Sequence, residues 1–176
     1  MSVYLISGPS GSGKTTLGEE LTKRGYAVIE TDSYPGLSGY QHNETGDWDK
    51  SQKSVYPRTQ EQLNTYSWNW DESVIQKILD ENRDVIVFFV GGAKNESNFW
   101  DLFERRFALY VSDEVLVTRL QSREPIRWTN DSPELKKQLE WNQKSRDYFE
   151  ASGATVLDSS KRIKRLADEL LNIIKS

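Results

Sequence analysis

The stretch GPSGSGKTT, residues 8–16, decides the fold of this 176-residue chain. It follows the apolar run Val3-Tyr4-Leu5-Ile6 and precedes a helical pattern with Leu17 and Leu21 four residues apart. The stretch matches G-x-x-x-x-G-K-[S/T] in the strand-to-helix context that this pattern requires. Glycines let the main chain curl so that several N–H groups converge on one anion, and the helix start adds a positive dipole end. The sequence therefore predicts a phosphate-binding loop.

Each position of this loop has an expected role in binding a nucleotide. Lys14 reaches the β- and γ-phosphates, and the Thr15 hydroxyl ligates Mg²⁺. We therefore expect ATP and Mg²⁺ as ligands, with Lys14 also acting in catalysis. The residues expected to bind the nucleotide are Gly8, Ser10, Gly11, Ser12, Gly13, Lys14, Thr15 and Thr16.

Short apolar strands alternate with helical patterns along the rest of the chain. Strands are expected at 3–7, 27–29, 84–90, 107–111 and 155–157, and helices at 13–24, 71–82, 95–103, 112–124, 132–151 and the C-terminal end. The run DVIVFFV (84–90) lacks polar alternation, which is typical of a strand covered on both faces. The alternation predicts an α/β fold with a five-stranded parallel sheet and helices on both faces. We expect one domain over residues 1–176.

Composition narrows the partners. The net charge is −4 and the positive charges are dispersed, so neither nucleic acid nor a membrane is an expected partner. The densest basic run, KRIKR (161–165), fits the solvated face of a helix. The chain has no cysteine, no signal peptide pattern and no membrane-length apolar run, which favours a cytoplasmic protein. His42 is the only histidine, which excludes a multi-histidine metal site.

The chain lacks the motifs of two other classes of nucleotide-binding protein. Regulatory GTPases need an N-K-x-D motif and a D-x-x-G metal loop, and the chain has neither. Mechanical ATPases usually carry an acidic pair at the end of an apolar strand, whereas the most apolar strand here ends in VGG. These absences favour a small kinase.

The order of the motifs resembles the small P-loop kinases, with shikimate kinase and gluconate kinase the nearest named members. The order is the phosphate loop, Glu30-x-Asp32 after the second strand, Gly91-Gly92 after the third and arginines after the fourth. In shikimate kinases the second strand ends in D-x-D. The resemblance implies that Glu30 helps to hold the metal and that Asp32 is a catalytic residue that binds the acceptor hydroxyl.

The same resemblance implies further substrate-binding residues. Gly91 and Gly92 match a glycine run that shikimate kinases place against the substrate. Arg119 and Arg123 match catalytic arginines of a lid, here at about 119–131, that closes on ATP. Arg146 matches an arginine that grips the substrate carboxylate, although Tyr148 follows it by two residues where the family has three.

The segment 33–70 lies where small kinases bind their acceptor. Its aromatic residues include Trp68 and Trp70, two apart in YSWNWDES, which either stack on an acceptor ring or pack the segment onto the domain. Arg58 is a candidate for an anionic acceptor. The expected reaction transfers the γ-phosphoryl group of ATP to a hydroxyl of a nucleoside, sugar acid or shikimate-like metabolite. The alternatives are a nucleoside monophosphate kinase and a nucleotide-binding regulatory protein without phosphotransfer. The expected state is a monomer or homodimer.

Overall fold

The computed structural model describes residues 2–49, 59–122, 129 and 131–176. Its strands are β1 Ser2–Ser7, β2 Ala27–Glu30, β3 Ser38–His42, β4 Trp48–Asp49, β5 Tyr66–Trp70, β6 Ile86–Val90, β7 Arg105–Tyr110 and β8 Thr155–Asp158. Its helices are α1 Lys14–Lys23, α2 Gln60–Thr65, α3 Glu72–Glu81, the 3₁₀ helix η1 Glu96–Leu102, α4 Asp113–Gln121, α5 Pro133–Ala151 and α6 Ile163–Lys175. Within these ranges no helix combines the length and apolar character that crossing a membrane requires.

The main sheet has five parallel strands in the order β2-β6-β1-β7-β8, which confirms the predicted fold class. β1 lies at its centre, with Ile6 beside Val90 of β6 and Ser7 beside Ala108 of β7. Neighbouring strands therefore end together. In an open α/β sheet a ligand binds at this carboxyl edge, where the phosphate loop also begins.

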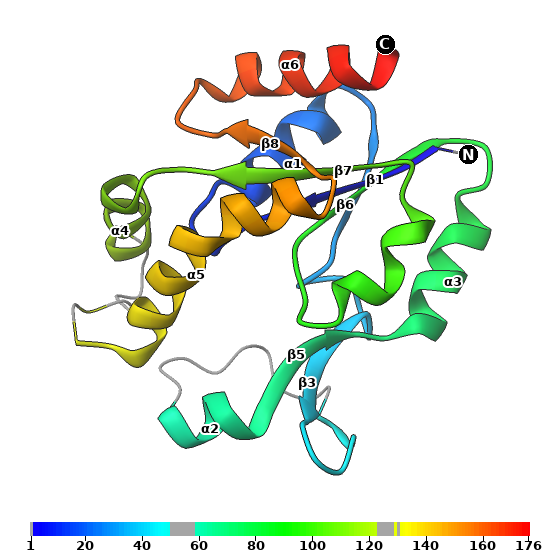
Figure 1. Cartoon of the computed structure of the whole chain (residues 1–176). Helices are drawn as coiled ribbons and strands as arrows, with labels where there is room; N and C mark the ends of the chain where they lie inside the picture. The colour runs from blue at the N-terminus through cyan, green and yellow to red at the C-terminus, as the bar shows by residue number, and fades with distance from the viewer. Residues whose placement is uncertain (1, 50–58, 123–128, 130) are drawn as a thin grey trace.

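Alternating residues of the central strands feed two hydrophobic cores. Tyr4, Ile6 and Phe88 point to one face, where α1 and α6 cover them. Val3, Leu5, Val87 and Phe89 point to the other face, where α3 and η1 lie. Figure 1 shows α6 above the main sheet and α3 and α5 below it. The unbroken apolar character of β6 follows from this double coverage.

Serine caps position the helices that follow β7. The Ser112 hydroxyl accepts a hydrogen bond from the Val115 N–H at the start of α4, and Ser132 does the same for Leu135 at the start of α5. Pro133 occupies the first turn of α5, as its position after Ser132 predicts. Helix α4 ends at Gln121, so Arg119 lies inside a described helix.

The segment 33–70 contains a second sheet that the sequence analysis did not predict. β3 pairs antiparallel with both β4 and β5, in the order β4-β3-β5, and α2 precedes β5. Figure 1 shows β3, β5 and α2 at the end of the molecule away from α6. Trp70 is 1% exposed and lies in the core with α3, so for this residue the packing alternative is correct.

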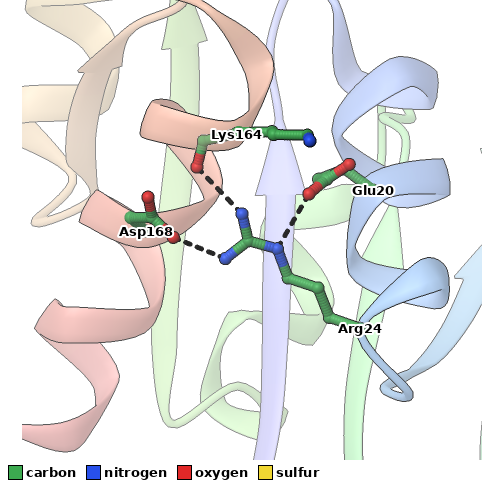
Figure 2. Close-up of polar contacts among 4 residues, drawn as sticks. All are labelled: Glu20, Arg24, Lys164 and Asp168. Carbon is green, nitrogen blue, oxygen red and sulfur yellow. Dashed lines mark hydrogen bonds and ion pairs between the residues drawn. The ribbon is translucent and has the colours of Figure 1, made fainter.

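Helices α1 and α6 are joined by a clasp around Arg24, the residue that ends α1 (Figure 2). Its guanidinium donates to Glu20 at 2.9 Å, to Asp168 at 2.6 Å and to the Lys164 carbonyl at 3.0 Å. The two carboxylates raise the pKa of Arg24. Because α1 begins at the phosphate loop, this clasp ties the loop's helix to the C-terminal helix.

Candidate functional site

The phosphate loop has a backbone conformation that favours glycine at three of its positions, Gly8, Gly11 and Gly13. Gly8 has φ 141°, and a Cβ there would lie 2.7 Å from the Leu109 carbonyl oxygen. Gly13 has φ 99° and is the N-cap of α1. The loop therefore turns sharply against β7 and delivers the chain to the start of α1, where the helix dipole favours an anion.

Arg119 braces the loop from outside. Its guanidinium donates to the carbonyl oxygens of Gly11 at 3.4 Å and Ser12 at 3.2 Å, and to the Ser159 carbonyl at 2.9 Å. The Ser159 hydroxyl also donates to the Ser12 carbonyl, at 2.5 Å. These donors occupy carbonyl oxygens of the loop and so fix the path of its main chain. In this structure Arg119 contacts the loop from α4, and its role in a lid stays a prediction.

Lys14 folds back over the loop. Its Nζ donates to the carbonyl oxygens of Gly8 at 2.7 Å and Pro9 at 2.9 Å. The Ser10 N–H donates to the side-chain oxygen of Gln138, a residue of α5, at 3.0 Å. A phosphate in the loop competes for both groups. Nothing in the sequence around Gln138 distinguishes it from an ordinary polar helix residue.

Glu30 and Thr15 lie together beside the loop. Burial raises the pKa of the Glu30 carboxyl, and the negative charge of Asp32 raises it further, while Lys14 and the Thr15 hydroxyl oppose the rise. Its Oε1 is buried and has no hydrogen-bond partner among the described residues; it packs on α1, where a Cβ on Gly18 would lie 2.4 Å away. A carboxylate and a hydroxyl suit Mg²⁺, which takes few protein ligands and completes its shell with water and phosphate. The two residues therefore fit the expected metal.

Asp32 is exposed just after β2. Among the described residues, one side chain donates a hydrogen bond to its carboxylate. The indole Nε1 of Trp68 donates to Asp32 Oδ1 at 2.9 Å. Trp68 is itself packed against Tyr40 of β3, edge to face, with ring centroids 4.9 Å apart. The small sheet thus orients the carboxylate, a contact that neither residue's sequence context indicates.

Gly91 and Gly92 follow β6, as predicted, but Gly91 has a packing reason to be glycine. A Cβ there would lie 1.7 Å from the Thr31 hydroxyl oxygen, and Thr31 is fully buried. A Cβ on Gly92 would lie 3.3 Å from Ser7 Oγ and 3.4 Å from Glu96 Oε2. The glycine run thus allows β2, β1 and η1 to approach one another, and its role in binding substrate stays a prediction.

The remaining predicted arginines are not gathered around the loop by the described contacts. Arg146 is exposed on α5, pairs with Glu150 at 3.0 Å, and has its guanidinium carbon 5.8 Å from the centre of the Tyr110 ring. The carboxylate of Glu150 raises the pKa of Arg146. Arg58 and Arg123 lie outside the described residues.

Glu96 is the acidic residue that the sequence analysis missed. Its side chain is 6% exposed, and its Oε2 accepts a hydrogen bond of 2.8 Å from the hydroxyl of Ser7, the residue before the phosphate loop. An acid near the start of a short helix is typical of helix capping, so the sequence alone gave no reason to place Glu96 at the site.

The profile of the AAA domain family matches residues 5–137, more than half of the chain and including the phosphate loop. The chain belongs to the AAA domain family. No curated protein sequence is significantly similar to this chain.

Solved structures of small P-loop kinases share the fold of this AAA domain protein. Shikimate kinase from Acinetobacter baumannii in complex with shikimate has a TM-score of 0.61 at 19% identity, covering 99% of this chain and 93% of its own. A gluconokinase from Sinorhizobium meliloti 1021 has a TM-score of 0.53 at 19% identity, covering 96% and 88%. Deoxyadenosine kinase from M. mycoides with bound dATP has a TM-score of 0.56 at 14% identity, covering both chains fully (100%). At these identities the likeness establishes the fold.

Proposed function

We propose that this protein is an ATP-dependent kinase that transfers the γ-phosphoryl group to a hydroxyl of a small metabolite. The observation that carries the proposal is Asp32, an exposed carboxylate held by Trp68 at the sheet edge where the phosphate loop begins. The fold shared with kinases of shikimate, gluconate and deoxyadenosine supports the same class of reaction. The acceptor is a nucleoside, a sugar acid or a shikimate-like molecule.

The phosphate loop and α1 hold the triphosphate. Loop amides and Lys14 bind the β- and γ-phosphates, and Lys14 leaves the carbonyl oxygens of Gly8 and Pro9 to do so. Thr15 and Glu30 would hold Mg²⁺, which when bound supplies positive charge to the phosphate oxygens. Arg119 keeps the loop in the receptive conformation, and Arg123 is proposed to neutralise charge on the transferred group.

Asp32 orients the acceptor hydroxyl and receives its proton. The acceptor oxygen forms a bond to the γ-phosphorus while the bond from that phosphorus to the β–γ bridging oxygen breaks. The products are the phosphorylated acceptor and ADP. Gly91, Gly92, Arg58 and Arg146 are proposed to contact the remainder of the acceptor.

Two substitutions separate nucleotide binding from transfer. A thermal-shift screen of nucleosides, nucleotides and sugar acids with ADP–Mg²⁺ first identifies an acceptor, and ADP production then measures turnover. Lys14→Ala is expected to abolish turnover. Asp32→Asn is expected to keep the Kd for ADP–Mg²⁺ within about threefold and to lower turnover by about 100-fold or more.

Asp47→Asn is the matched control, because Asp47 is an exposed carboxylate of the small sheet's hairpin that bonds only locally, to Thr45. It is expected to behave as wild type. Equal losses of binding and turnover in Asp32→Asn contradict the role given to Asp32. A wild-type protein without affinity for any nucleoside triphosphate contradicts the whole proposal.

A further inference from the structure

We propose that Glu96 is a positioning residue of the nucleotide site, which holds the entry of the phosphate loop through Ser7 and acts by its charge on Lys14. The inference relies on the proposed function only in taking the loop as the ATP site. It adds a residue that neither the motif nor the roles given above include.

The side chain of Glu96 is buried, and the residue is 6% exposed. Burying a carboxyl group costs free energy unless polar groups form hydrogen bonds with it. Ser7 supplies one hydrogen bond and the Ala93 backbone a second. Both partners belong to the carboxyl edge of the sheet, since Ser7 ends β1 and Ala93 follows β6.

Ser7 connects Glu96 to the phosphate loop. Ser7 is covalently joined to Gly8, whose carbonyl oxygen accepts the Lys14 ammonium at 2.7 Å. A shift of Ser7 therefore moves the first residue of the loop. Gly92 lies beside this contact, because a Cβ there would be 3.3 Å from Ser7 Oγ and 3.4 Å from Glu96 Oε2.

The residues before Glu96 connect it to the small sheet, which orients Asp32. The two residues before Glu96 bind the small sheet: the Lys94 N–H donates to the Trp68 carbonyl at 2.8 Å, and the Asn95 side chain exchanges two 2.9 Å hydrogen bonds with the Trp70 backbone. The segment 94–96 thus joins the strand that orients Asp32 to the start of the phosphate loop.

Glu96 also interacts electrostatically with charged residues around it. Burial raises the pKa of the Glu96 carboxyl, while Ser7, Ala93 and the positive charges of Lys14 and Arg106 oppose the rise. Burial raises the pKa of Tyr148 of α5, and the charge of the Glu96 carboxyl raises it further. Bound phosphates bring negative charge to Lys14, so nucleotide favours the protonated form of Glu96. Affinity for nucleotide is therefore expected to fall as Glu96 ionises with rising pH.

The test is calorimetric titration of the protein with ADP–Mg²⁺ from pH 4.5, the ordinary pKa of a glutamate, up to pH 8. Glu96→Ala and Ser7→Ala each remove the hydrogen bond that holds the loop entry, and each is expected to raise the Kd about tenfold or more. Glu96→Gln keeps an acceptor for Ser7 and mimics the protonated carboxyl, so it is expected to stay within about threefold of wild type at the lowest pH of the titration. It is also expected to lose the part of the pH dependence that Glu96 causes.

Ser145→Ala is the matched control, because Ser145 is as buried as Ser7 but donates to the Asn142 carbonyl within its own helix. It is expected to bind as wild type. Should Glu96→Ala fail to fold, Ser7→Ala carries the same expectation without opening a large cavity. A Kd within twofold of wild type for Ser7→Ala overturns the positioning role, and an unchanged pH dependence in Glu96→Gln overturns the role of charge.

These outcomes are distinct from failure of the proposed function. A protein that binds ADP–Mg²⁺ but phosphorylates no hydroxyl compound contradicts the kinase and leaves the Glu96 result intact. A wild-type protein that does not bind ADP–Mg²⁺ overturns both.

Discussion

Replacing Gly18 with alanine separates the stability of α1 from the function of Glu30. Alanine in a helix interior is favoured over glycine by about 0.5–1 kcal/mol. The new methyl group would lie 2.4 Å from Glu30 Oε1, about 1 Å closer than ordinary contact. The Oε1 atom is at the end of the flexible Glu30 side chain, so the carboxylate can rotate away from the new methyl group. That rotation costs about 0.5–1.5 kcal/mol if it leaves a preferred rotamer.

The two effects nearly cancel, so Gly18→Ala is expected to change the free energy of unfolding by less than about 1 kcal/mol in urea denaturation. The displaced Glu30 no longer faces Thr15. Because repositioning a residue at a metal site commonly lowers metal affinity 10- to 100-fold, the Mg²⁺ concentration that half-saturates ADP binding is expected to rise about tenfold or more.

Two comparisons test this reasoning. Thr22→Ala changes an exposed position of the same helix and is expected to leave the Mg²⁺ dependence unchanged. Glu30→Gln is expected to reproduce the loss, and adding Gly18→Ala to it should change little, because both act on one group. An unaltered Mg²⁺ dependence in Gly18→Ala refutes the metal role of Glu30. A loss of stability above about 3 kcal/mol refutes the idea that Glu30 is free to move.

Three further substitutions test packing, orientation and the helix clasp. Gly91→Ala is expected to lower the free energy of unfolding by about 1–3 kcal/mol in urea, because its methyl group would overlap Thr31, and Thr31→Ala in the same chain should recover part of the loss. Trp68→Phe removes the donor to Asp32 and is expected to lower turnover about tenfold while the Kd for ADP–Mg²⁺ stays constant; a matching loss of nucleotide affinity contradicts an orienting role. Arg24→Ala breaks the clasp and is expected to cost about 0.5–1.5 kcal/mol in low salt and less in 1 M salt; a loss that salt does not reduce points to packing instead of charge.

The main sheet was predictable because its signals are local. Val3-Tyr4-Leu5-Ile6, the glycines of the loop and the apolar run 84–90 each occupy a short stretch whose pattern has few structural alternatives. Ser112 and Ser132 likewise cap their helices through residues three positions away. Such signals require no knowledge of distant contacts.

The small sheet was not predictable in the same way. Its strands are short, and the alternation of β5 is masked because Trp68 and Trp70 share one face but meet different environments. Trp70 enters the core, whereas Trp68 reaches Asp32. Only the pairing of β5 with β3 decides this, and that pairing joins residues that are far apart in the sequence.

The site shows the same division. Loop residues follow from the motif, whereas Glu96 and the bracing position of Arg119 depend on approaches between distant segments. Arg119 contacts Gly11 and Ser12 from more than a hundred residues away. An arginine in the last turn of a helix is ordinary in sequence, because cations are favoured there by the helix dipole.

The packing of α1 on α6 has a consequence for the order of folding during synthesis. Leu17 and Leu21 share their core with Leu166 and Leu170, so the first helix meets its partner only when the last helix leaves the ribosome. Until then only the part of α1 that faces α6 stays uncovered, because residues of β1 and β6 already pack against Leu17 and Leu21. The helix that follows the phosphate loop therefore completes its packing only after α6 has been synthesised.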